Sequence, residues 1–235
     1  MIASSAGYPD SQPRAKVTFA VFGTAGTDDF NYIEMRMLDR KLTTPHRLAI
    51  FPGGHTLPPE DVALEAIEWM ELQAMKAGRR TRDDALVAQL YEKRMQKIGS
   101  AADVAAVERL EDVVEDFKGL RDVAAEEARA QELARRPEIK AARAEQKASD
   151  DEEARLISDL GALEACLPDE ERRPQCVRRL RDLLPRLSRA AQAAEESAER
   201  SRARRVLRAV TSGVSARTQD REYLSLLEQY GIRGR

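Results

Sequence analysis

The chain has 235 residues, of which 39 are Lys or Arg and 41 are Asp or Glu, and its net charge is −2. Because the two signs are interspersed, no strong field attracts nucleic acid or an anionic membrane surface, and we expect neither partner. No apolar run approaches the ~20 residues needed to span a bilayer, and residues 1–7 lack the basic start and apolar stretch of a signal peptide. The sequence as written therefore predicts a cytoplasmic protein, or an exported one if the true N-terminus is missing.

Composition divides the chain into two unequal parts. Eight of the eleven aromatic residues precede residue 92, whereas the remainder is mostly Ala, Glu, Arg and Leu. Aromatic side chains are the largest contributors to a packed core. The first part therefore has the composition of a globular unit, and the second has that of charged helices. We predict that the boundary separates residues 1–78 from residues 79–235.

The first part alternates strands and helices. Residues 1–7 have the composition of a buried strand end, and Val17–Phe22 is a β-branched and aromatic run that predicts a strand. A turn-rich loop is expected over residues 23–29, a helix from near Phe30, and a further strand over His46–Phe51. A Pro-Pro pair then suits the first turn of a second helix, where a missing N–H costs nothing. This order predicts an α/β fold with parallel strands.

The second part is predicted to be helical throughout. Breaks are expected at Gly99, Gly119, Pro137 and Pro168, because Gly and Pro interrupt helices. Residues 138–155 are so rich in charge and Ala that they form either a solvated helix or a partly ordered segment. No internal repeat of ~34 residues is found, so the second part is not an obvious repeat array.

The only two cysteines, Cys166 and Cys176, flank a stretch with two prolines that predicts a helix-loop-helix turn. Such a hairpin can bring two thiols within bridging distance. Free thiols are the preferred interpretation for the cytosol, and a disulfide is expected in an exported protein. No His or third Cys lies nearby to complete a zinc site, and no Gly-rich loop cradles a phosphate. The sequence therefore predicts no metal and no cofactor.

One of the two histidines, His55, follows a Gly-Gly pair on a loop between a predicted strand and a predicted helix. Asp28 and Asp29 follow the preceding strand. Loops at the carboxyl ends of neighbouring parallel strands open on the same side of a sheet, so an aspartate and His55 can meet there. In nucleophilic acyl transfer, a histidine base is oriented by a buried carboxylate. This pattern predicts an acid–base pair.

Each of these residues also has a structural interpretation. Asp28 and Asp29 suit the N-terminus of the helix that starts near Phe30, where carboxylates are favourable. His55 can be a loop histidine without a role. The other histidine, His46, lies at a strand start and is predicted to be structural.

Three segments stand in one order along the first part: Gly23-Thr-Ala-Gly-Thr-Asp-Asp-Phe-Asn-Tyr, Phe51-Pro-Gly-Gly-His-Thr and Pro58-Pro-Glu-Asp-Val-Ala-Leu-Glu-Ala-Ile-Glu-Trp. Together they resemble the C-terminal part of an α/β-hydrolase of the dienelactone-hydrolase and polyhydroxybutyrate-depolymerase-like esterase branch. The resemblance covers residues 1 to about 77 and implies a partial α/β-hydrolase sheet followed by an all-α helical extension. It also implies that Asp29 is the catalytic acid, with Asp28 as the alternative, and that His55 is the general base.

The chain departs from this family in its nucleophile. The Gly-x-Ser-x-Gly motif occurs nowhere, and the oxyanion-hole loop and the first five strands have no counterpart. Ser4 and Ser5 precede a Gly without the context of a nucleophile elbow. The resemblance thus implies a truncated serine-esterase-type hydrolase that is inactive alone. Three explanations are open: a gene start assigned too late, so that a hydrolase segment is missing, a degenerate truncated copy, or a subunit completed by a partner chain. A gene start assigned too late is the preferred explanation.

The competing class is a non-enzymatic helical scaffold or protein-interaction module. Most of the chain is charged helix with apolar seams, which suits a protein partner on the helical region. The two hypotheses differ at one point that a structure can examine. A hydrolase site requires Asp29 and His55 within hydrogen-bond reach, and a scaffold does not.

Overall fold

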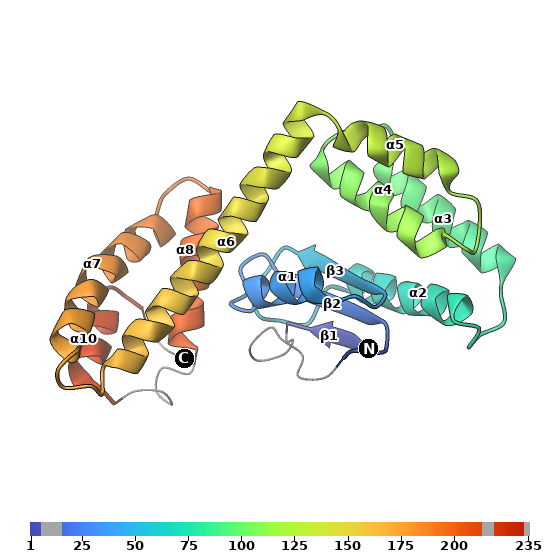
Figure 1. Cartoon of the computed structure of the whole chain (residues 1–235). Helices are drawn as coiled ribbons and strands as arrows, with labels where there is room; N and C mark the ends of the chain where they lie inside the picture. Colours follow the sequence, from blue (N-terminus) through green and yellow to red (C-terminus); the bar gives the residue numbers. More distant parts are fainter. Residues whose placement is uncertain (6–15, 213–218, 233–235) are drawn as a thin grey trace.

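A computed structural model of the protein describes residues 1–5, 16–212 and 219–232 (Figure 1). Among these residues 64% are helical, in nine helices, and the sheet has three strands. The predicted fold class, a partial α/β-hydrolase sheet with a helical extension, is therefore wrong: the protein is mainly helical and no hydrolase sheet is evident. The strand-loop-helix pattern that suggested it is common to any small set of parallel βα units. None of the described helices is long and apolar enough to cross a membrane.

The sheet contains β1 (Ile2–Ser4), β2 (Val21–Gly26) and β3 (His46–Phe51), which are parallel and lie in the order β1-β2-β3. Strand β3 has the predicted bounds. The prediction for β2 was wrong, because this strand starts four residues later and runs through Gly23 to Gly26. All six residues of β2 are buried, and a Cβ at Gly23 would lie 2.7 Å from the Met35 side chain. Glycine therefore serves close packing in this strand and does not mark a turn.

Helices α1 (Tyr32–Lys41) and α2 (Glu60–Lys76) cover opposite faces of the sheet. The ring of Phe22 meets Trp69 of α2 edge-on at 5.6 Å, whereas the next residue, Gly23, lies against Met35 of α1. Successive strand residues point to opposite faces, which explains this alternation. The two helices fix the sheet from both sides and leave its carboxyl end open to loops.

A helical group follows, formed by α3 (Asp84–Ile98), α4 (Val104–Phe117) and α5 (Ala124–Ala134). Its core also contains Leu72 and Met75 from the end of α2. Asp83 and Asp103 cap α3 and α4 by accepting hydrogen bonds from backbone N–H groups three residues later. The core of this group thus includes residues from both sides of the predicted boundary after residue 78, and that boundary stays a prediction.

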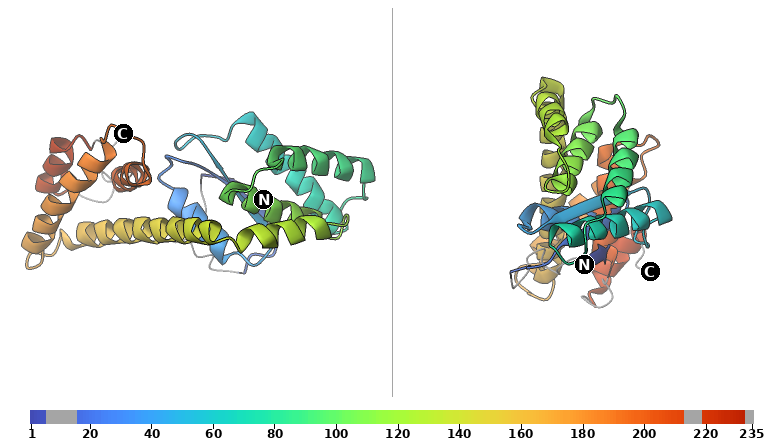
Figure 2. Two further views of the ribbon diagram at one scale, coloured as in Figure 1. Left: turned by 90° about the horizontal axis from the view of Figure 1, so that it is seen from above. Right: turned by 90° about the vertical axis from the view of Figure 1, so that its right-hand side faces the viewer.

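Helix α6 (Pro137–Cys166) is a single run of 30 residues that connects this group to the C-terminal helices (Figure 2). It includes residues 138–155, which were predicted to form either a solvated helix or a partly ordered segment. Asp150 and Glu153 near its middle are 1% exposed. Asp150 pairs with Arg36 and Arg40 of α1, and Glu153 pairs with Arg205. The charged middle of α6 is therefore packed against other elements and is ordered by ion pairs.

The C-terminal half of α6 packs with α7 (Arg173–Ala191), α8 (Ala198–Thr211) and α10 (Arg221–Gln229) around a separate apolar core. Cys166 and Cys176 form a disulfide at the turn between α6 and α7, with Cα atoms 6.4 Å apart. The preference for free thiols was therefore wrong. The predicted helix-loop-helix turn is present, and it places both sulfur atoms at the end of this core.

Candidate functional site

The loops that follow β2 and β3 lie side by side at the carboxyl end of the sheet. The Thr27 N–H donates to the carbonyl of Phe51 at 2.8 Å, and the Asp28 N–H donates to the carbonyl of Gly53 at 2.7 Å. A Cβ at Gly26 would clash with the carbonyl oxygens of Gly53 and Gly54. The glycines thus permit a close approach of the two backbones, which carry Asp29 and His55 toward each other.

Asp29 and His55 form a hydrogen-bonded pair. His55 Nδ1 lies 3.1 Å from Asp29 Oδ1, and this oxygen also accepts the Asn31 N–H at 2.9 Å. Asp29 is fully buried, whereas the His55 side chain is 48% exposed. The imidazole stacks on the Phe30 ring with 4.4 Å between ring centroids. Because a carboxylate only accepts, Nδ1 carries the proton and Nε2 is the basic nitrogen.

The two aspartates have different surroundings, although they are adjacent. Asp29 contacts His55, whereas the Asp28 carboxylate is 29% exposed and lies 3.8 Å from Arg208. Asp29 also accepts the N–H of Asn31, which is the N-cap residue of α1. Asp29 therefore lies beside the N-terminus of this helix, but it is not the predicted cap. His46 lies at the start of β3, where Nδ1 is 2.7 Å from the Thr44 carbonyl oxygen. The catalytic roles of Asp29 and His55 stay predictions.

A cavity of about 540 Å³ opens beside His55. One wall comes from the two loops and includes Phe30, Gly54 and Thr56. The other wall comes from the C-terminal end of α8 and includes Arg208 and Thr211. No local sequence pattern predicts that these residues lie at the site, because about 180 positions separate Asp28 from Arg208.

Two arginines attach α8 to the loop that carries Asp29. Arg205 donates to the Thr27 carbonyl at 2.8 Å, and Arg208 donates to the Asp28 carbonyl at 2.5 Å. Arg205 is buried, forms two hydrogen bonds with Glu153 and lies over the Tyr32 ring at 4.1 Å. The loop conformation therefore depends on a helix from the other end of the chain.

No nucleophile contacts His55 within the described residues. The hydroxyl of Ser5 donates to the Thr56 carbonyl at 3.4 Å, and the hydroxyl of Thr211 donates to the Arg208 carbonyl at 3.1 Å. Ser5 is buried and has a φ of 51°, but the residues after it lie outside the described part. Cys166 and Cys176 form a disulfide, so neither provides a thiol nucleophile.

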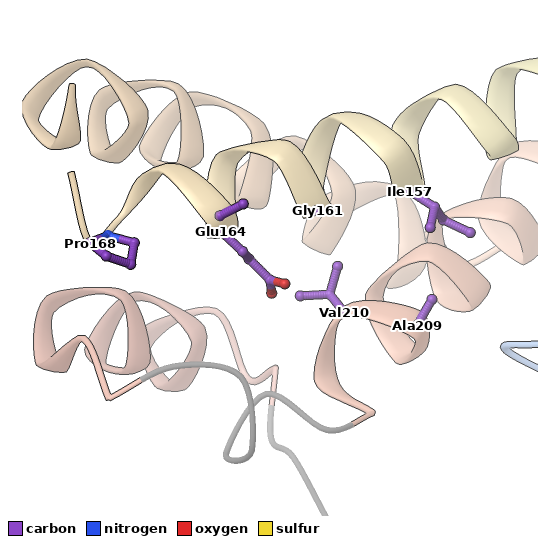
Figure 3. Close-up of a pocket in the computed structure, with 7 residues that line it drawn as sticks. Ile157, Gly161, Glu164, Pro168, Ala209 and Val210 are labelled. Carbon is purple, nitrogen blue, oxygen red and sulfur yellow. The ribbon is translucent and has the colours of Figure 1, made fainter. Parts of the chain in front are cut away.

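A second cavity, of about 410 Å³, lies between α6 and α8 (Figure 3). Its described lining is apolar except for Glu164, whose carboxylate accepts the Tyr223 hydroxyl at 2.7 Å. A search of residues 1–5, 16–212 and 219–232 finds no group of three or more His, Cys, Asp or Glu placed to hold a metal ion. The cavity beside His55 is the candidate site because its histidine is hydrogen-bonded to a fully buried carboxylate. His46 lines another cavity, and it lies 3.8 Å from the partly exposed carboxylate of Asp39.

Comparisons with known proteins add no assignment. No family model matches the chain, and no curated protein or solved structure shows significant similarity to it. The resemblance to the α/β-hydrolases is therefore still a hypothesis that rests on the quoted motifs.

Proposed function

We propose that Asp29 and His55 are the acid and the base of a site that hydrolyses carboxylic esters. The hydrogen bond between His55 Nδ1 and the buried Asp29 carboxylate carries this proposal. In acyl-transfer sites, such a carboxylate fixes the tautomer of the base and stabilises the imidazolium that forms when the base takes a proton. The proposal rests on this pair and its cavity, and it requires no particular number of strands.

Water is the nucleophile that this chain can use by itself. His55 Nε2 accepts a proton from water as the water oxygen bonds to the carbonyl carbon of the ester. The imidazolium then returns that proton to the alcohol oxygen as the C–O bond breaks, and the products are a carboxylic acid and an alcohol. General-base assistance of this kind typically contributes 10²–10⁴-fold in rate. Because the described residues bring no hydroxyl or thiol nucleophile to His55, we expect slow turnover.

The test is release of p-nitrophenol from p-nitrophenyl acetate by the full chain and its variants. We expect His55→Ala to lower the enzyme-dependent rate by about 100-fold, because the base is removed. Asp29→Asn should also lower the rate strongly, since an amide cannot hold the Nδ1–H tautomer in the same way. Asp28→Asn should have the smaller effect of the two aspartate variants.

His46→Gln is the matched control, because it removes the other histidine of the chain. It should retain the wild-type rate. Equal rates for the wild type and His55→Ala would contradict the proposal. A larger loss for Asp28→Asn than for Asp29→Asn would reassign the acid.

A scaffold is the second candidate function, and one observation favours it. Helix α6 contributes Ile139 to the core around α3, α4 and α5, and Leu160 and Leu163 to the core around α7, α8 and α10. A helix that holds two helical cores at its two ends suits a protein that positions partners. Under this hypothesis, His55→Ala leaves partner binding unchanged.

A further inference from the structure

We infer that Arg208 binds a carboxylate or phosphate group of the ligand that enters the His55 cavity. The inference rests on the proposed function for the hydrolytic step, whereas the binding of an anion can be measured separately. The class of substrate would then be an ester that carries a second, negatively charged group. Three properties of Arg208 support this assignment.

The first property is position. Arg208 lies in the last turn of α8 and lines the cavity together with His55. Its Nη1 donates to the carbonyl of Asp28 on one side, and it lies 3.7 Å from where a Cβ on Gly54 would be on the other. The guanidinium therefore lies between the two loops at the edge of the cavity, next to the residue that precedes the base.

The second property is unused hydrogen-bonding capacity. A guanidinium has five N–H donors, and Arg208 makes a single hydrogen bond with the described residues. Arg205, one turn earlier, uses Nε, Nη1 and Nη2 in three hydrogen bonds and is buried. The Arg208 side chain is 49% exposed. Arg205 is thus committed to structure, whereas Arg208 has donors available for a ligand.

The third property is charge. Asp28, which lines the same cavity, forms an ion pair with Arg208 at 3.8 Å, but this distance is too long for a hydrogen bond. Charge-assisted, bidentate bonds of arginine to carboxylate or phosphate are about twice as strong as neutral hydrogen bonds. A ligand anion would therefore gain more from this guanidinium than Asp28 does. Phe30, stacked on His55, offers an apolar surface to the rest of the ligand.

Two ligands that differ in one charge separate this assignment from non-specific binding. Monomethyl glutarate and the neutral dimethyl glutarate are titrated into the full chain, and the ring resonances of isotope-labelled histidine are followed by NMR. The chain has two histidines, so His46 serves as an internal reference and His55 as the reporter. We expect the His55 resonance to respond to the monoester with at least tenfold higher affinity than to the diester.

Arg208→Gln should remove this preference, and Arg208→Lys should restore it in part, because lysine keeps the charge without the bidentate geometry. Arg202→Gln is the matched control, since Arg202 lies on the same helix outside the cavity lining. Inorganic phosphate, added in place of the monoester, shows which anion is preferred. Unchanged monoester affinity in Arg208→Gln overturns the assignment, and so does equal affinity of the wild type for both esters.

Hydrolysis of the two esters distinguishes failure of this inference from failure of the proposed function. Binding that depends on Arg208 without hydrolysis that depends on His55 would contradict the proposed function and support the anion site. Hydrolysis of both esters at equal kcat/KM, unaffected by Arg208→Gln, would support the function and overturn the anion site. Circular dichroism of each variant verifies folding.

Discussion

Asp28 and Asp29 are adjacent in sequence, and yet only Asp29 turns toward His55. The sequence indicated these two residues as the candidates for the catalytic acid, because carboxylates that follow a predicted strand are easily recognised. The resemblance to the α/β-hydrolases favoured Asp29 and left Asp28 as the alternative, whereas the local pattern alone did not distinguish them. The choice depends on how the Thr27 and Asp28 N–H groups bond to the neighbouring loop, which is a contact between segments that are 24–25 residues apart. The sequence could thus predict that Asp29 and His55 can pair. It could not predict the hydrogen bond between them or the burial of Asp29.

Asp112 offers a test at the level of one titrating group. Partial loss of hydration raises the pKa of this half-buried carboxyl to about 6, against the attraction of Arg47 and Arg94. Arg47 Nη1 lies 2.6 Å from Asp112 Oδ2. Between pH 4 and 6 the folded state therefore binds more protons than the unfolded state, and the free energy of unfolding falls as the pH rises. Since the side chain is 41% exposed, we expect this fall to be about 1 kcal/mol.

Asp112→Asn should remove that part of the pH dependence. Urea denaturation at pH 4 and pH 6.5 gives the change in the free energy of unfolding between the two pH values for each protein. The change in the wild type is then compared with the change in Asp112→Asn. Asp84→Asn is the control, because the Asp84 side chain is 76% exposed. The interpretation is wrong if the wild type and Asp112→Asn lose the same free energy of unfolding between the two pH values.

At the level of elements, the attachment of α8 to α6 can be tested through its buried ion pair. Arg205 and Glu153 are 7% and 1% exposed, and burial raises the pKa of Glu153. Arg205→Met leaves a buried carboxylate without its partner, which typically costs about 3–5 kcal/mol. We expect that loss at pH 7 in urea denaturation, and a smaller loss at pH 5, where Glu153 more readily takes up a proton.

The double variant Glu153→Gln with Arg205→Met should recover part of the stability, because no charge is then buried alone. Glu199→Gln, an exposed charged residue in the first turn of the same helix, should remain close to the wild type. A loss below 1 kcal/mol for Arg205→Met alone would show that this ion pair does not hold α8 against α6. It would also weaken the argument that α8 fixes the loop that carries Asp29.

The elements were predictable to the extent that local signals specify them. The bounds of β3 and the helix after the Pro-Pro pair follow from composition and from the geometry of proline. Strand β2 was placed too early, because glycine usually indicates a turn, whereas here it serves packing under Met35. The docking of α8 at the site leaves no local pattern. Long-range contacts of this kind determined the fold class that sequence analysis assigned incorrectly.

For the whole molecule, the disulfide and the two helical cores predict uneven stability. Cys166 and Cys176 have a sequence separation of 10. In the chain-entropy model, a disulfide that closes such a loop lowers the entropy of the unfolded state and so stabilises the fold by about 3 kcal/mol. The variant with both cysteines changed to alanine should lose about 2–3 kcal/mol. This loss of stability should affect mainly the core that contains these cysteines, around α7, α8 and α10.

Native-state hydrogen exchange can locate that loss. Amides of α7 and α10 should exchange faster in the double alanine variant, and amides of α3 and α4 should keep their wild-type rates. Equal acceleration in both groups would show that the two cores unfold as one unit. That outcome would contradict the interpretation of α6 as a connection between separately stable groups.

The length of α6 also has a mechanical consequence. A helix of 30 residues is about 45 Å long, so a tilt of about 5° around its centre displaces each end by about 2 Å. Near its centre, Asp150 forms an ion pair with Arg36 of α1, and its C-terminal half packs against α8. A tilt of this size would therefore shift the half of α6 that packs against α8, the helix whose end forms one wall of the His55 cavity.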